Sequence, residues 1–395
     1  MSLTYKDNIN KIKFLIIHSG NHPSNNRLID NLYNILIEYG KVYSTNIQSK
    51  GILSYIKEIL SVYNIIIFKK IDILITIEPF YGLFFVKLWK KIFKLNLLYY
   101  SGNVNYDIFT KFGYNKLLCF IFKKIEINHI KCADTIITCN YSMKTFFLER
   151  SKINRVFAIP EYIPFPFDYN NFEHPSFIKK GFLNIVYIAV IHSEYVCGNK
   201  FPRGWELIYA CKNLVEMGIT NIFFTVIGSG DGLDYLKTLI HKYKLEDYFE
   251  IVGFVDDQTK WEILRFMDIG FSEDYESYIT HKYNLSSKIQ EYIVNKIPVI
   301  TGTQGDKGLI INNETTKCGI CIKPLNENDL NDCSRYINDI SSTIEHLLNN
   351  KNELDNYKLN METIRNTIFS KENIFKQYRE VVEEMVENKS KSILN

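Results

Sequence analysis

The sequence has 395 residues, of which 46% are hydrophobic and 23% are charged, and its formal net charge is +3. A chain of this length has room for two domains that each bury a core, and the composition is ordinary for a globular protein. So small a net charge gives no electrostatic reason to expect nucleic acid as a partner. No uncharged apolar run is long enough to predict a membrane-spanning helix.

The cysteine pattern favours free thiols. Eight cysteines are scattered along the chain, mostly inside apolar runs, which is typical of reduced, buried thiols in a cytoplasmic protein. Cys318 and Cys321 have CxxC spacing, but the sequence has no second such pair and no histidine pair at metal-ligand spacing. We therefore expect no metal site there. The first ten residues lack the apolar segment of a secretion signal, so the prediction is a cytoplasmic location, with membrane association left open.

The first half of the chain alternates buried strands with helical patterns. Residues 13–18 form a short apolar run, typical of a strand buried on both faces. A helical periodicity follows from Arg27 to Tyr39, and Gly40 is expected to end that helix. Further buried strands are predicted at residues 71–77, 96–100 and 135–138. This alternation predicts a doubly wound parallel sheet.

The loop after the first strand, residues 19–26, is rich in turn-forming residues. Dinucleotide-binding enzymes carry three glycines at this position, whereas here Gly20 stands alone, so that function is not predicted. We expect the loop, with Gly20 and Asn21, to face an acceptor substrate or the space between two domains.

Two segments of the first half, residues 84–94 and 116–125, are both apolar and basic. One interpretation is a pair of crossover helices that pack their apolar faces on the sheet and keep their lysines in water. The other is a surface that touches anionic lipid and a lipid-linked acceptor. We prefer the first, because any helix of an α/β domain needs an apolar face, and we keep peripheral membrane contact as the alternative.

A proline-rich segment, residues 159–167, ends the first pattern and is typical of a semi-rigid connector. A second α/β series follows, with strands predicted at residues 183–191, 222–227, 268–272, 298–301 and 319–323, a strand and turn at 249–257, and helices at 204–217 and 233–243. The tail from residue 371 is a charged amphipathic helix, long enough to pack back on the first domain. We therefore predict two Rossmann-like doubly wound domains facing each other across a cleft, with bounds 1–165 and 181–370, a linker at 166–180 and a C-terminal helix at 371–395.

Two loops of the second half carry candidate ligand-binding residues. Gly228, Ser229 and Gly230 follow a strand directly, and glycines there let backbone amides approach a phosphate, although a plain turn fits equally well. Asp256 and Asp257 stand in a turn before a predicted helix. Such a pair can bind metal, but capping of that helix is the preferred interpretation, and no metal is expected.

Residues 285–302 combine a polar loop, a short helix and a buried strand. Ser286 and Ser287 can cap the helix, and Lys288 and Glu291 lie one turn apart on it. The helix amides, the helix dipole and the Lys288 ammonium suit a phosphate, and Glu291 suits the ribose hydroxyls beside it. We therefore predict a nucleotide diphosphate pocket at the carboxyl edge of a parallel sheet. The alternative is a solvated Lys288–Glu291 pair.

Five elements follow one another in the second half: residues 203–210 (RGWELIYA), 226–230 (VIGSG), 251–255 (IVGFV), 288–292 (KIQEY) with 298–300 (PVI), and 319–322 (GICI). Their order and spacing resemble the retaining nucleotide-sugar glycosyltransferases of family four, which have the GT-B fold. They look like that family's KG helix, GxG loop, base-side strand, glutamate helix with its PVI strand, and closing GI strand. The first half is similar more loosely, through residues 133–142 (ADTIITCNYS) and 159–160.

The resemblance implies roles for individual residues. Glu291 matches the family glutamate that holds the ribose, but Tyr283 stands where a first glutamate is usual, so Ser287 and Lys288 are expected to contact the donor diphosphate. Arg203 matches the lysine of the KG pair, and with Lys288 it would stabilise the charge on the departing diphosphate. The implied donor site is completed by Gly228, Ser229, Gly230, Phe254 and Val255, and Asn103 stands in the loop where many relatives have a histidine.

The activity that the resemblance implies is transfer of a sugar from a nucleotide diphosphate sugar to a glycan, lipid-linked or other acceptor, with retention of configuration. Surface polysaccharide or glycoconjugate biosynthesis is the expected setting. Such a transfer needs no cofactor and no protein nucleophile. Two alternatives stay open: a catalytically inactive relative that binds nucleotide or glycan as a partner subunit, and a nucleotide-sugar 2-epimerase of the same fold.

Overall fold

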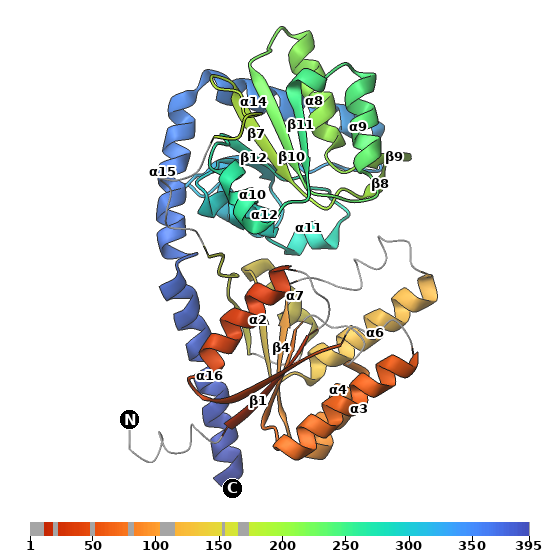
Figure 1. Cartoon of the computed structure of the whole chain (residues 1–395), viewed down its shortest axis with the longest axis vertical. Helices are drawn as coiled ribbons and strands as arrows, with labels where there is room; N and C mark the ends of the chain where they lie inside the picture. The colour runs from red at the N-terminus through yellow and green to blue at the C-terminus, as the bar shows by residue number, and fades with distance from the viewer. Residues whose placement is uncertain are drawn as a thin grey trace. The chain divides into compact units, whose positions relative to one another are not determined.

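The structure is a computed structural model of the chain, and it describes residues 12–18, 23–47, 52–77, 83–102, 115–151, 155–164 and 174–394. The chain divides into two compact units. Unit 1 consists of Met1–Tyr162 and Ile368–Asn395, and unit 2 consists of Ile163–Thr367. Unit 1 is therefore made from two stretches of sequence with all of unit 2 inserted between them (Figure 1).

Unit 1 is built on a parallel sheet with the strand order β2-β1-β3-β4-β5-β6. The strands are β1 (Ile12–His18), β2 (Gly40–Asn46), β3 (Ile73–Ile77), β4 (Asn96–Ser101), β5 (Thr135–Thr138) and β6 (Val156–Ala158). Every residue of β3 and β5 is buried. Helices on both faces of the sheet account for these continuous apolar runs.

The helices of unit 1 are α2 (Pro23–Leu36), α3 (Ile52–Lys69), α4 (Leu83–Phe93), α6 (Lys116–Cys132), α7 (Tyr141–Arg150) and α16 (Lys371–Leu394). The connection through α2 runs in one direction across the sheet, and those through α3, α4 and α6 run in the other. Right-handed crossovers therefore place α2 on one face and α3, α4 and α6 on the opposite face. Helix α16 packs against α2 (Figure 1), where Arg379 forms an ion pair with Glu38 at 2.9 Å.

The prediction for the segment after β1 is wrong in two respects. The helix ends at Leu36 rather than at Tyr39. Gly40 does not end a helix but begins β2, which pairs with β1 along its whole length. The sequence did not reveal β2 because an edge strand is covered less completely than a central one, and its residues, GKVYSTN, are mostly half-buried and form no apolar run.

Unit 2 contains a second parallel sheet, with the strand order β11-β10-β7-β12-β13-β14. The strands are β7 (Leu183–Ile188), β10 (Ile222–Ile227), β11 (Phe249–Gly253), β12 (Ile269–Phe271), β13 (Val299–Gly302) and β14 (Gly319–Ile322). The helices are α8 (Trp205–Glu216), α9 (Leu233–Lys242), α10 (Asp257–Leu264), α11 (Ile279–Tyr283), α12 (Ser287–Val294), α13 (Asp306–Ile311), α14 (Leu330–Asn349) and α15 (Lys351–Thr367), with a 3-10 turn, η1 (Glu246–Tyr248). The predicted pair of parallel, doubly wound sheets is confirmed in the described part of the chain.

The order of strands in unit 2 reverses at β7. From β7 the chain builds β10 and β11 on one side, and then β12, β13 and β14 on the other. The loops that leave β7 and β12 therefore diverge at the carboxyl edge of the sheet. In open α/β sheets this switch point is where ligands bind.

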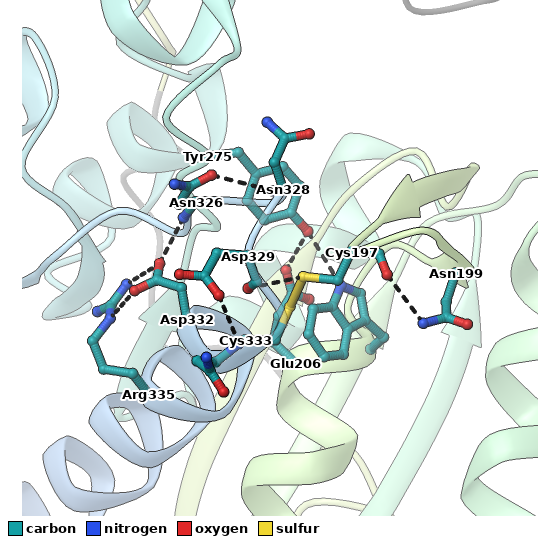
Figure 2. Close-up of a disulfide and its surroundings, with 12 residues drawn as sticks. Cys197, Asn199, Glu206, Tyr275, Asn326, Asn328, Asp329, Asp332, Cys333 and Arg335 are labelled. Carbon is teal, nitrogen blue, oxygen red and sulfur yellow. Dashed lines mark hydrogen bonds and ion pairs between the residues drawn. A yellow bond between two sulfur atoms is a disulfide. The ribbon is translucent and has the colours of Figure 1, made fainter.

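A hairpin that the sequence did not predict, formed by β8 (Ser193–Val196) and β9 (Asn199–Pro202), lies between β7 and α8. Cys197 in its turn forms a disulfide with Cys333 of α14 (Figure 2). The prediction of free thiols is wrong for this pair, because the two residues are 136 positions apart and only the tertiary fold brings them together. The cytoplasmic location that rested partly on free thiols stays a prediction. Among the described residues, no helix is both long and apolar enough to cross a membrane.

Candidate active site

Helix α12 is fixed over the switch point by Tyr292. The backbone N–H of Ile188, at the end of β7, donates to the Tyr292 hydroxyl at 3.1 Å, and this hydroxyl donates to the carbonyl of Phe271, at the end of β12, at 3.2 Å. A Cβ on Gly270 would fall 2.5 Å from the Tyr292 ring, so the ring can pack on β12 only because this residue is glycine. These contacts hold α12 against the carboxyl ends of β7 and β12.

Arg203 and Lys288 converge on Glu273, just beyond the end of β12. Lys288 Nζ donates to Glu273 Oε2 at 2.7 Å, and Arg203 Nε lies 3.8 Å from Glu273 Oε1. Arg203 Nε also donates to Glu194 Oε1 of the β8–β9 hairpin at 2.6 Å. Lys288 Nζ stands 4.5 Å from the centre of the Tyr187 ring, within cation–π distance. The fold thus brings two cations that are distant in sequence, Arg203 and Lys288, to the carboxylate of Glu273.

This cluster is ionised although it is buried. Burial acts to raise the pKa of Glu273, but Lys288 and Arg203 outweigh it and bring the pKa down to about 2. Burial lowers the pKa of Lys288, and Glu273 partly offsets that effect. For Arg203, burial again opposes the charged form, but Glu194 and Glu273 prevail and raise its pKa. A carboxylate with so low a pKa is a poor proton acceptor at neutral pH, so Glu273 is suited to holding the two cations.

Glu206, at the start of α8, lies beside this cluster in the opposite protonation state. Its side chain is fully buried, and it accepts a hydrogen bond from the Tyr275 hydroxyl (Figure 2). Burial, aided by the negative charge of Glu273, raises the pKa of Glu206 to about 8. The Glu206 carboxyl is therefore mostly protonated at neutral pH and adds little negative charge beside Arg203 and Lys288.

Glu291 pairs with Lys260 and not with Lys288. Its Oε1 accepts a hydrogen bond from Lys260 Nζ of α10 at 2.8 Å, and Lys260 also donates to Asp257 Oδ1 at 2.9 Å. The side chain of Glu291 is 5% exposed and that of Lys288 is 11% exposed. The alternative of a solvated Lys288–Glu291 surface pair is therefore wrong, since both side chains are largely buried and each pairs with another element.

The glycines of the loop after β10 pack closely against the loop after β7. Gly228 has φ 142°, and a Cβ there would lie 1.8 Å from the carbonyl oxygen of Ala189. A Cβ on Gly230 would lie 2.3 Å from the carbonyl oxygen of Ile191. This approach of two backbone segments explains both glycines without a ligand, whereas Ser229 between them is exposed. Contact of this loop with a donor stays a prediction.

The other predicted donor residues stand at the same edge of the sheet with less contact to the cluster. Phe254 is 73% exposed and Val255 is half-buried, and both follow β11, which β10 separates from β7. Ser287 is exposed, and Ser286 precedes α12 without a side-chain bond to its amides, so the predicted serine cap is wrong. The acceptor-side residues Gly20, Asn21 and Asn103 lie outside the described residues.

The predicted role of Asp256 as a cap is confirmed. Its Oδ1 accepts from the backbone N–H of Thr259 at 2.7 Å at the start of α10. Within the described ranges, no group of three or more His, Cys, Asp and Glu side chains is placed to hold a metal ion. Burial raises the pKa of Cys318 and of Cys321 to about 12, so neither CxxC thiol ionises readily.

Sequence reasoning missed three residues that organise this site: Glu273, Glu194 and Lys260. Glu273 had a usable signal, because it follows a buried strand of the second series almost directly and carboxyl-edge positions are where ligand sites form. Glu194 had none, because its hairpin was not predicted. Lys260 was visible only as a residue of an amphipathic helix.

Comparison with known proteins agrees with this architecture. Residues 205–358 match the family profile described as Glycosyl transferases group 1. No curated protein matches the sequence. Among solved structures, sucrose-phosphate synthase from Thermosynechococcus elongatus is similar with a TM-score of 0.68 and 11% identity, over 95% of this chain and 99% of that one. WaaG, a glycosyltransferase involved in lipopolysaccharide biosynthesis, is similar with a TM-score of 0.63 and 12% identity, over 93% of this chain and 98% of that one.

A third similar structure is TarM from S. aureus, solved in complex with fondaparinux, alpha-GlcNAc-glycerol and UDP. The TM-score is 0.55 and the identity is 18%, over 82% of this chain. The chain spans 58% of the length of TarM. At these identities the solved structures establish the fold alone. Residues 205–358, which include Glu206, Glu273, Lys288 and Glu291, are therefore a glycosyl transferases group 1 domain, in a chain with the two parallel-sheet, Rossmann-like domains of the GT-B fold.

Proposed function

We propose that this chain is a retaining glycosyltransferase that moves a sugar from a nucleotide diphosphate sugar to a glycan, lipid-linked or other acceptor, in the synthesis of a surface polysaccharide or glycoconjugate. The observation that carries the proposal is the convergence of Arg203 and Lys288 at the switch point of a group 1 domain. Support also comes from TarM, which was solved with UDP, and from WaaG, which is involved in lipopolysaccharide biosynthesis.

In the proposed reaction, Arg203 and Lys288 stabilise the negative charge that grows on the departing diphosphate. Preorganised cations in a buried site are effective because they need not rearrange as charge develops. Glu273 holds Lys288, and Glu273 with Glu194 holds Arg203, so both cations have fixed positions. Their partial neutralisation by carboxylates also lowers the cost of burying two positive charges.

In this proposal, the remaining residues contact different parts of the donor. The amides at the start of α12, with Ser287, would meet the phosphates. Glu291, held by Lys260, would accept hydrogen bonds from the ribose, since a carboxylate can accept several at once. The loop 228–230 would approach the phosphates, Phe254 and Val255 would lie beside the base, and unit 1 would bind the acceptor through the segments of Gly20, Asn21 and Asn103. The nucleotide sugar is a substrate, and no cofactor is proposed.

The test begins with a thermal-shift panel of UDP-, GDP- and ADP-sugars, because a ligand that binds only the native state raises the melting temperature. The sugar that binds is then used to measure release of nucleoside diphosphate and the configuration of the product. We expect Lys288→Met to lower kcat roughly a hundred- to thousandfold, by loss of one charge-stabilising group. Lys282→Met, an exposed lysine on the neighbouring α11, is the matched control and should leave the rate unchanged.

Other outcomes would replace this proposal. Binding of a nucleotide sugar without turnover would indicate a partner subunit, and release of a free epimer would indicate a 2-epimerase. A panel in which no nucleotide sugar shifts the melting temperature or reacts would reject the proposed donor class altogether.

A further inference from the structure

The outer sides of α3, α4 and α6 in unit 1 carry apolar residues that the fold does not bury. Helix α3 already has a packed face, with Ile59, Val62 and Ile66 in the interior. Beside that face, α3 exposes a second apolar stripe at helical spacing, in which Leu53 is 79% exposed and Phe68 is 78% exposed. The further members of this stripe are Ile56, Leu60, Tyr63 and Ile67.

Helices α4 and α6 repeat this arrangement. In α4, Val86 and Trp89 are buried, whereas Leu88 and Ile92, one turn apart, are more than half exposed. In α6 the interior side is near its C-terminal end, and the exposed apolar residues of its first turns are Leu117, Leu118, Phe120 and Ile121. The preferred sequence interpretation, that the apolar faces of these helices only pack on the sheet, therefore explains one side of each helix and leaves the other unexplained.

The three helices lie next to one another on one face of the unit 1 sheet (Figure 1). Helix α4 packs on α6, and Lys90 Nζ of α4 donates to the carbonyl of Cys132 at the end of α6, at 2.6 Å. The rings of Tyr63 on α3 and Phe93 on α4 lie 5.7 Å apart. We call the outer side of these helices the α3–α4–α6 surface. Neighbouring exposed apolar groups of this extent mark a binding surface.

The charges on this surface have one sign. Lys57, Lys91 and Lys124 are exposed among the apolar residues, one on each helix. Lys124 Nζ lies 5.4 Å from the centre of the Phe120 ring, so the apolar and cationic groups share the same area. The acidic residues of the three helices are Glu58 and Glu126, which are half-buried and buried respectively.

We propose that the α3–α4–α6 surface binds an anionic lipid bilayer, with its leucine, isoleucine and phenylalanine side chains at the level of the headgroups and its lysines against lipid phosphates. The long apolar stems of lysines let them cover apolar surface while the ammonium reaches a charged headgroup. Each lysine near an anionic membrane contributes further attraction.

Two features favour a bilayer over a protein. The basic residues exposed on these helices are lysines, with no arginine in their sequences, whereas protein interfaces are enriched in arginine and depleted in lysine. A second copy of the chain would bring one lysine-rich surface against another, and juxtaposed like charges oppose association. This inference does not depend on the proposed transferase function, since it concerns binding in the absence of donor.

The experiment is co-sedimentation of the full chain with vesicles of phosphatidylcholine, with and without phosphatidylglycerol, at low and high salt. We expect binding to the vesicles that contain phosphatidylglycerol, weakened by salt because the lysine–phosphate attraction is screened. The triple substitution Lys57→Glu, Lys91→Glu and Lys124→Glu should weaken partitioning by at least about a hundredfold, from the contribution of each lysine. Leu53→Ser with Phe120→Ser should also weaken binding to the vesicles that contain phosphatidylglycerol, although it removes no charge.

The controls make equal changes elsewhere. Lys237→Glu, Lys376→Glu and Lys391→Glu remove the same charge from exposed positions off the surface, and Leu330→Ser with Leu359→Ser removes two leucines that are 65% and 64% exposed. Both controls should bind vesicles as the unaltered chain does, and all variants should keep its melting temperature. Binding that is absent in the unaltered chain, or that falls equally in controls and test variants, would overturn the proposal. So would self-association without vesicles that is lost in the Leu53 and Phe120 variant, because the surface would then be a dimer interface.

Discussion

Replacing Glu206 by glutamine should make unit 2 less sensitive to rising pH. Glu206 is fully buried, and its pKa rises from an ordinary 4.5 to about 8 in the folded chain. Between these values the folded state keeps a proton that the unfolded state has lost, so the contribution of Glu206 to stability is full below pH 4.5 and is lost as the pH rises from there through the folded pKa. The slope is roughly 1.4 kcal/mol per pH unit, and the full loss above pH 8 is on the order of 5 kcal/mol.

Glutamine cannot ionise but can still accept the hydrogen bond that Tyr275 donates. We therefore expect Glu206→Gln to match the unaltered chain near pH 5 and to exceed its stability by a few kcal/mol near pH 8. Urea unfolding at a series of pH values measures this, followed by tryptophan fluorescence, because Trp205 donates to the Tyr275 hydroxyl at 3.3 Å and so reports on the same contacts.

The control is Glu216→Gln, at the exposed end of the same helix. It removes a carboxylate without touching a buried group, so its stability should follow that of the unaltered chain at every pH. If the curves of Glu206→Gln and the unaltered chain ran parallel from pH 5 to pH 8, the buried carboxyl would not have the protonation state assigned to it. The environment described around Arg203 and Lys288 would then be wrong as well.

Two further predictions concern the framework of unit 2. Gly228→Ala should lower stability by several kcal/mol, because the new Cβ would lie 1.8 Å from a backbone oxygen. Gly218→Ala is the control: φ is 84° and no atom lies within 4 Å of the new Cβ, so it should cost only about 1 kcal/mol of backbone strain. Thermal unfolding measures both losses, and equal losses would show that the loops after β7 and β10 do not pack as described. Non-reducing peptide mapping should recover Cys197 linked to Cys333, and recovery of both cysteines as free thiols would contradict the pairing. Cys333→Ser should lower stability by roughly 2–4 kcal/mol in oxidising buffer and by far less when a reductant is present.

Much of the fold could be predicted because each buried parallel strand appears in the sequence as a short apolar run. β5 and β10 are found at the predicted residues, 135–138 and 222–227, since each is an uninterrupted apolar run covered on both faces. The edge strand β2 and the β8–β9 hairpin contain no such apolar run, because their residues are partly exposed and polar. Local pattern therefore revealed the apolar strands, including the edge strands β11 and β14 of unit 2, and missed the partly polar ones.

The site was predictable only in part, for the same reason. The one-turn spacing of Lys288 and Glu291 ahead of a buried strand placed both residues on one short helix. Their partners depend on which strands are neighbours: Glu273 meets Lys288 because α12 lies over β7 and β12, and Glu291 meets Lys260 from the helix after β11. Contacts between residues that far apart in sequence follow from the strand order, which periodicity does not encode.

The insertion of unit 2 within unit 1 has a consequence for how the chain folds during synthesis. The interior of unit 1 includes Ile374, Tyr378 and Val382 of α16 alongside Leu28 and Leu32 of α2. When the ribosome has made the first 162 residues, α2 is present but α16 is not, so one side of that sheet still lacks part of its cover while all of unit 2 is translated. Unit 2 comes from one uninterrupted stretch and can complete its core as soon as it emerges, so the N-terminal half of this chain finishes folding after the half that follows it.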